Sequence, residues 1–197
     1  MLVLENIANV LSGVSLREAG GGASRFMRLS DLSEIKAGRE PVLMAGEAPA
    51  VARALTIEEG DLIVGARGAE TVVCVANDAI LGAFISVDLY LVRPNRAIVD
   101  PQFLAAFLEQ PSTQMIFTVN KQGTSLSRLP KEALENIQVP VPSMPSQRRI
   151  AELAQSVQEE NRLLKRLAEL KSFFGREAVA RAIRATDAHH HFNGDRT

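Results

Sequence analysis

Apolar residues change their spacing along the chain, and each spacing predicts a different kind of element. From Asp61 they gather in short blocks rich in β-branched side chains, which are typical of strands. The blocks GDLIVGARG and TVVCVAN predict one strand each. The block AILGAFISVDLYLVRP predicts two strands or one bent strand, with Gly82 at a bulge. A further short strand is expected at residues 26–29, and loops and turns at residues 41–60.

Helical spacing begins after residue 100. Asp100 is a good N-cap and Pro101 suits the first helical position. A second short helix is expected from Pro111 to about Val119, and one helical turn at residues 130–134. The stretch 138–142 must be extended, because each proline excludes helix from the residue before it, and such a strand belongs at a sheet edge.

A long helix is predicted to begin near Gln147, with Ser146 as its cap. It carries apolar residues at two heptad positions, interrupted by Glu160 and Lys171, and Gly175 is expected to break or bend it. From Gln147 to Phe174 it would span roughly 42 Å at 1.5 Å per residue. The heptad residues are Ile150, Val157 and Leu164 at one position, and Leu153, Leu167 and Phe174 at the other.

This apolar stripe is too wide to be left in water. The pattern favours pairing with a helix from a second copy or from another subunit, and the alternative is a helix packed along its own domain. We therefore expect an α+β fold in which residues 1–145 form a small β-rich domain with short helices. Residues 146–186 would form the helix for spacing and dimerisation, and residues 187–197 a disordered tail.

Charge is divided unevenly along the chain, although the formal net charge is only −1. Residues 1–145 hold 12 Lys and Arg against 16 Asp and Glu, whereas residues 146–186 hold 9 basic against 5 acidic residues. An acidic domain that binds nucleic acid must gather its few cations on one face. The single cysteine, Cys74, cannot form an internal disulfide, and no apolar run approaches a membrane span or a signal peptide. A cytoplasmic protein without a membrane partner is therefore expected.

Candidate catalytic chemistry is sparse. The patterns GxxxxGK[ST] and GxGxxG are absent, and the acidic residues lack metal-ligand spacing. The run His189–His191 lies near a terminus, where metal binding would be incidental, and Cys74 is expected to be a small core residue. We expect no enzyme activity, no metal and no cofactor. A small enzyme with a coiled-coil dimerisation arm is an alternative interpretation.

The segment 120–128 is the best candidate for a nucleic-acid contact. It combines cations, an amide and small hydroxyls on a glycine-hinged loop, which suit phosphates and base edges. Its candidate contact residues are Lys121, Gln122, Thr124, Ser125 and Arg128. Three further arginines, Arg17, Arg25 and Arg28, flank a loop with three consecutive glycines and are added to the set. An ordinary solvated turn is the alternative interpretation of the segment.

Residues 120–155 resemble the end of a target-recognition domain in the specificity subunits of type I restriction-modification systems. That family shows a Gly-Thr/Ser turn, a short helix with a leucine, an I-x-V-P-x-P extension and an x-Q-x-x-I-A helix start. The matching residues here are Gly123-Thr-Ser, Leu134, Ile137-Gln-Val-Pro-Val-Pro and Gln147-Arg-Arg-Ile-Ala. EEGDLIVGARG and DPQFLAAFLEQPSTQ also resemble family segments, whereas the first 55 residues fit loosely.

The resemblance implies a non-catalytic DNA-reading subunit. Full-length members carry two recognition domains and two long antiparallel helices, and this chain has one of each, as in a half-length form. A two-fold homodimer would restore the missing half and read an inverted, interrupted repeat in double-stranded DNA. Methyltransferase and restriction subunits would be its partners and would supply the chemistry. The alternative is a protein-protein adaptor with the same fold that has lost DNA binding.

Overall fold

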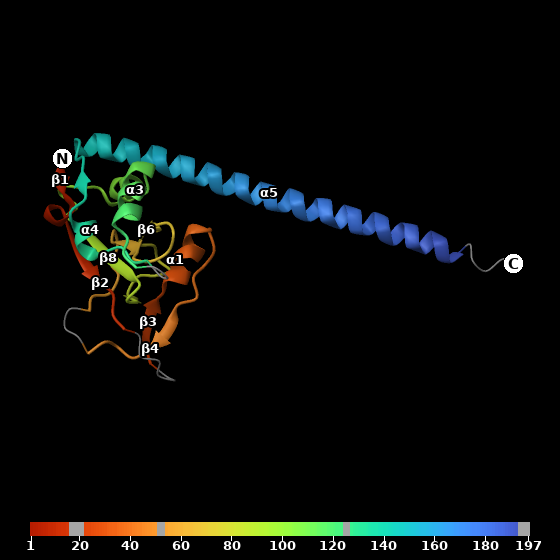
Figure 1. The fold of residues 1–197 in the computed structure, drawn as a ribbon, viewed down its shortest axis with the longest axis horizontal. Coiled ribbons are helices and arrows are strands. Elements are labelled where there is room, and N and C mark those ends of the chain that lie inside the picture. Colours follow the sequence, from red (N-terminus) through yellow and green to blue (C-terminus); the bar gives the residue numbers. More distant parts are fainter. Residues whose placement is uncertain (16–21, 51–53, 124–126, 193–197) are drawn as a thin grey trace. The chain divides into compact units, whose positions relative to one another are not determined.

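The structure is a computed structural model that describes residues 1–15, 22–50, 54–123 and 127–192, with side chains described to residue 184. The chain divides into two compact units, Met1–Ala154 and Gln155–Thr197. The first unit contains strands and short helices, and the second belongs to the long helix α5, so the expected α+β fold is confirmed (Figure 1).

A four-stranded antiparallel sheet forms the centre of the first unit. Its strand order is β2 (Ala8–Ser12), β8 (Leu89–Pro94), β5 (Leu62–Gly65) and β6 (Val73–Val75). The blocks beginning at residues 60 and 71 therefore form strands as predicted. The strand β2 lies in a segment whose sequence gives no clear pattern, and its partner β8 is about 80 residues away in the chain.

The two inner strands are buried on both faces, which explains their unbroken apolar runs. Leu62 and Val64 pack into a core on one face of the sheet, whereas Ile63 packs into a second core on the other face. The first core is covered by side chains of the short helices, among them Phe103, Leu104, Leu108, Phe117 and Leu134. The second core is closed mainly by Met27, Leu32, Ile57, Ile80 and Ile85.

A smaller three-stranded sheet belongs to the second core. It consists of β4 (Met44–Gly46), β3 (Ser24–Met27) and β7 (Phe84–Ile85), with β3 and β7 parallel. Helix α1 (Leu29–Lys36) follows β3 directly. The block from residue 79 to 94 therefore forms two separate strands, β7 and β8. The expectation of loops alone at 41–60 is wrong at β4, because pairing with β3 orders a segment with little strand pattern of its own.

The short helices after residue 100 form where the sequence predicts them. In α2 (Pro101–Leu108) the Asp100 carboxylate accepts hydrogen bonds from the backbone N–H groups of Gln102 at 2.9 Å and Phe103 at 3.0 Å. Helices α3 (Pro111–Asn120) and α4 (Lys131–Glu135) follow. The extended segment after α4 forms β9 (Gln138–Val139), which pairs only with β1 (Leu2–Val3), and the 3-10 turn η1 (Leu4–Asn6) follows β1.

Helix α5 runs without interruption from Met144 to Phe192, a length of 49 residues. The predicted start near Gln147 is wrong by three residues: Pro145 lies in the first turn, where its missing N–H needs no partner, so the helix begins before it. Of the outcomes considered for Gly175, a break does not occur and the helix continues through it, as the expected helix over residues 146–186 requires, because a glycine inside a helix costs only about 1 kcal/mol.

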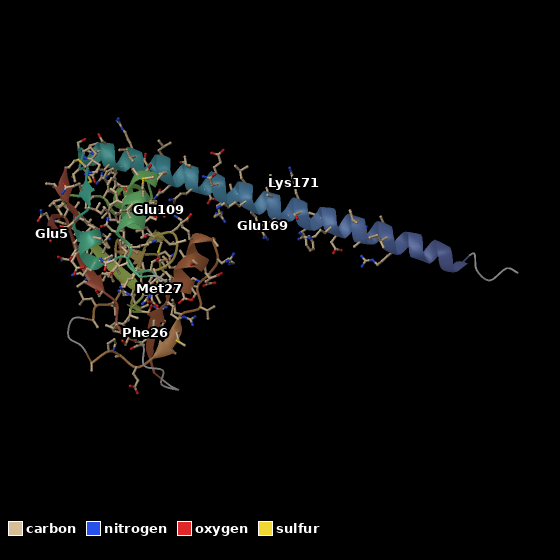
Figure 2. The ribbon with its side chains drawn as sticks, viewed as in Figure 1. Glu5, Phe26, Met27, Glu109, Glu169 and Lys171 are labelled. Carbon is tan, nitrogen blue, oxygen red and sulfur yellow. The ribbon has the colours of Figure 1, made fainter. Side chains whose placement is uncertain are left out.

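The C-terminal end of α5 reaches into residues 187–197, for which disorder is expected from the sequence. Helix continues to Phe192 there, and residues 193–197 lie outside the described residues. Along α5, the side chains of Glu169 and Lys171 leave the helix on opposite sides (Figure 2), as a rotation of about 100° per residue requires. No helix in the described part of the chain is long and apolar enough to span a membrane.

Candidate nucleic-acid interface

Three connecting segments meet at one end of the central sheet. They are the loop that follows β5, the turn between β7 and β8, and the segment between α3 and α4. Backbone hydrogen bonds join them: the Leu129 N–H donates to the Ala66 carbonyl, and the Ala66 N–H donates to the Asp88 carbonyl, both at 2.8 Å. A backbone bridge also pairs Arg67 with Arg128. The candidate loop is thus anchored on a rigid sheet.

Arg128 is held in place by three neighbours. Its Nη1 donates to the Val87 carbonyl at 2.8 Å and lies 3.9 Å from an Asp88 carboxylate oxygen. The guanidinium stacks over the Tyr90 ring, 5.3 Å from its centroid. The Tyr90 hydroxyl, which is buried, donates to the Leu129 carbonyl at 2.7 Å and fixes the same segment. The guanidinium of Arg128 therefore has a defined orientation.

Arg67 lies beside Arg128, and its Nε donates to the Asp88 carboxylate at 2.5 Å. The side chains of Arg67, Asp88 and Arg128 are each about one-third exposed, at 33%, 38% and 32%. Arg67 is not among the contact residues predicted from the sequence, although its position between two glycines at the end of a strand is a usable signal. One carboxylate thus lies between two partly exposed guanidinium groups.

Lys121 and Gln122 connect the same segments through hydrogen bonds. The Lys121 ammonium donates to the carbonyls of Gly68 at 2.8 Å and Ala69 at 2.9 Å, so it holds the loop that carries Arg67. Burial lowers the pKa of Lys121, and the nearby Glu70 carboxylate opposes that shift. The backbone of Gln122 exchanges two hydrogen bonds with Arg128, at 2.8 and 2.9 Å, and its side chain is exposed.

The remaining predicted contact residues lie apart from this group or outside the described residues. The guanidinium of Arg25 bonds to the Ala79 and Leu81 carbonyls, and that of Arg28 bonds to Asp31 and to the Val42 carbonyl. Among described residues, no hydrogen bond or ion pair joins these two arginines to Lys121 or Arg128. Arg17, Thr124 and Ser125 lie outside the described residues.

A hollow of about 430 Å³ lies next to the loop. The hollow is lined by residues that include Asn120, Gln122, Glu132, Asn136, Ile116 and Ile137. Amide groups can pair with the adenine edge, so this hollow extends the polar surface that the arginines begin. Among the described residues, no group of three or more histidine, cysteine, aspartate or glutamate side chains could hold a metal ion.

The predicted interface residues of the long helix are all exposed. Leu153 and Phe174 are the most exposed, at 66% and 65%, and the other four are 44–55% exposed: Ile150, Val157, Leu164 and Leu167. Leu163, Leu170 and Phe173 add further exposed apolar area. Burial of such side chains against a partner is favourable by about 25 cal/mol per Å² of apolar surface.

These features define a class of protein: a small α+β unit with loop cations at one sheet end, joined in sequence to a long helix that bears an apolar stripe. The chain belongs to the family of the type I restriction modification DNA specificity domain, whose model matches residues 47–171. That match includes three strands of the central sheet (β5, β6 and β8), the arginine pair and the first part of α5, and leaves out β2. No curated protein matches the chain significantly.

Three solved structures share the fold. A chain from a study of complex assembly and conformational transition in the type I R-M system is 21% identical with a TM-score of 0.63, over 89% of this chain and 42% of its own length. The HsdS subunit from Thermoanaerobacter tengcongensis is 22% identical with a TM-score of 0.56, over 84% and 38%. The type I S subunit from M. genitalium is 16% identical with a TM-score of 0.53, over 98% and 46%. The chain spans less than half the length of each.

Proposed function

We propose that the chain is a specificity subunit that recognises a DNA sequence for a type I restriction-modification system. The observation that carries this proposal is the family match over residues 47–171, supported by the likeness in fold to three chains from such systems. In this proposal the chain recognises the target DNA sequence. Methyltransferase and restriction subunits bind to it and supply the chemistry.

The recognition surface is proposed to be the sheet end that carries Arg67, Lys121, Gln122 and Arg128. Phosphate contacts position a protein on DNA, whereas base contacts in the groove specify the sequence. An arginine suits guanine and an amide suits adenine, and this end of the sheet carries both kinds of group. Loops held on a rigid sheet lose little conformational entropy on binding, which favours affinity.

A second copy of the chain is proposed to complete the functional unit through α5. The exposed stripe from Ile150 to Phe174 can pair with itself in an antiparallel dimer, since a two-fold axis places the same apolar surface of both copies face to face. Two identical recognition units would then read an inverted, interrupted repeat. The length of the paired helices would set the gap between the two half-sites.

The proposal is tested by selecting duplexes from a randomised double-stranded library with the purified chain and measuring affinity at several salt concentrations. We expect one enriched motif and an affinity that falls steeply with salt, because phosphate contacts release counterions.

The adaptor function is favoured by one observation, the excess of 16 acidic over 12 basic residues in the first 145. Absence of any enriched motif, with salt-independent behaviour, would contradict DNA recognition and leave the adaptor.

Replacement of Lys121 and Arg128 by alanine should weaken binding to the selected duplex by about 1–3 kcal/mol, because charge-assisted contacts and loop anchors are lost. The measurement is a mobility-shift titration. Arg39→Ala with Arg96→Ala is the matched control, because it removes the same charge from exposed ion pairs with Glu34 and Glu59. Equal losses for the two double variants would mean that only net charge matters and that the recognition surface is misplaced.

A further inference from the structure

The carboxylate of Asp88 lies between two arginines from different segments. Arg67 approaches it from the loop after β5 at 2.5 Å, and Arg128 approaches it from the segment before α4 at 3.9 Å. Arg128 is also fixed by the Val87 carbonyl and by the Tyr90 ring. The two guanidinium groups are thus oriented before any ligand is bound.

This arrangement fits a base edge better than a phosphate. A phosphate contact needs positive charge, and Asp88 removes one unit of charge from the cluster, which weakens such a contact. Guanine recognition instead needs a guanidinium held in one plane, because its two hydrogen bonds to O6 and N7 are bidentate. Prior orientation of the arginines lowers the entropy lost on binding.

We propose that Asp88 is a positioning residue that holds Arg67 and Arg128 to read guanine in the major groove. This inference rests on the proposed function, DNA-sequence recognition, and names the base and the residues that read it. The carboxylate acts through the arginines, and its cost in affinity is offset by a gain in selectivity. Removal of its charge should therefore change affinity and selectivity in opposite directions.

The decisive variant is Asp88→Asn, which keeps the shape of the side chain. We expect affinity for unrelated duplex to rise, because a negative charge near DNA is lost. The preference for the selected motif over a duplex with one guanine replaced should fall roughly tenfold, because a bidentate contact is lost. Asp78→Asn is the matched control, since Asp78 is exposed on a separate turn. It should leave the preference unchanged.

Lysine variants separate charge from geometry. Arg67→Lys and Arg128→Lys keep the charge but lose the planar fork, so they should retain affinity for unrelated duplex and lose the preference at one guanine position. Thermal unfolding of each variant, followed by circular dichroism, shows that it is folded. Both substitutions leave the backbone hydrogen bonds between the loops in place, so the loops should keep their conformation in the variants.

The outcomes are distinct. If wild-type chain enriches no motif, the proposed function fails and this inference fails with it. If wild-type chain enriches a motif but the Asp88 and lysine variants keep its preference at every guanine, the guanine inference alone is wrong. A uniform loss of affinity across all sequences, with a salt dependence reduced by about one counterion per arginine, would identify the arginines as phosphate contacts and also overturn it.

Discussion

Asp61 is buried, at 1% exposure, and its carboxylate is fully engaged by neighbouring groups. Arg93 donates to both carboxylate oxygens at 2.8 Å, and the backbone N–H of Glu58 donates to one of them at 2.8 Å. Arg93 also donates to the Thr56 carbonyl at 3.0 Å. The hydrogen bond to Asp61 is the main cause of the raised pKa of Arg93. The pair fixes the loop before β5 to strand β8.

Asp61→Ala should reduce the free energy of unfolding by about 3 kcal/mol, because the partly buried guanidinium of Arg93 loses its buried carboxylate partner and keeps only the exposed Glu58. Urea unfolding followed by circular dichroism measures the change. Glu59→Ala is the control, since the Glu59 side chain is 85% exposed and its ion pair with Arg96 should contribute less than about 1 kcal/mol. A loss for Asp61→Ala no larger than that of the control would contradict the structural role.

Cys74 is partly buried and packs against the second core, where its thiol is largely shielded from water. Desolvation raises the pKa of its thiol to about 12, so the neutral form is favoured in the folded state. Because the folded pKa lies above the unfolded value, this contribution to stability is complete below about pH 8.5 and is lost as the pH rises toward 12. Iodoacetamide at pH 8 should therefore label unfolded chain and react very slowly with folded chain. Rapid labelling of folded chain would refute the assignment.

At the scale of elements, Gln147 ties the start of α5 to the first unit. Its side chain is buried, accepts from the Asp100 N–H at 2.8 Å, and donates to the carbonyls of Ile98 at 3.1 Å and Pro142 at 2.9 Å. Asp100 in turn caps α2. One amide therefore fixes the beginnings of two helices and the end of the extended segment between them.

Gln147→Leu should destabilise the first unit by about 3 kcal/mol, because three partly buried backbone groups lose their hydrogen-bond partner. Gln147→Glu is the informative comparison, since it keeps the acceptor for Asp100 but cannot donate to either carbonyl. It should cost at least as much at neutral pH. Thermal unfolding measures both, and Gln158→Leu, on an exposed part of the same helix, is the reference. Similar stability of all three variants would contradict the predicted role of Gln147.

Elements with local signals could be predicted from the sequence, and those that depend on distant partners could not. The caps and prolines of α2 and α3 are visible in the chain itself. Strand β4 has little pattern of its own and exists through pairing with β3. The candidate site shows the same division. Lys121 and Arg128 lie in one basic segment that can be recognised in the sequence, whereas Arg67 is distant in the sequence and is brought to Arg128 by a backbone bridge in the folded chain.

At the scale of the whole molecule, the stripe on α5 is proposed to mediate pairing of two chains. Leu164→Asp should shift the protein from dimer to monomer in sedimentation equilibrium, because a charge would be buried in the seam between helices. Gln155→Asp is the control, since residue 155 lies on the opposite side of the helix from the heptad positions. A dimer that survives Leu164→Asp would exclude this face as the interface.

The burial of β5 and β8 on both faces restricts how such a chain can diversify. A polar replacement at any of Leu62 to Val64 would place a polar side chain in one core or the other, so neither face of the inner strands tolerates polar substitution. Under the proposed function, new target preferences would therefore arise in the connecting segments at the sheet end. Libraries that randomise the exposed positions 69, 70, 87 and 122 should yield folded proteins with altered preferences, whereas libraries in the inner strands should yield mostly unfolded chains.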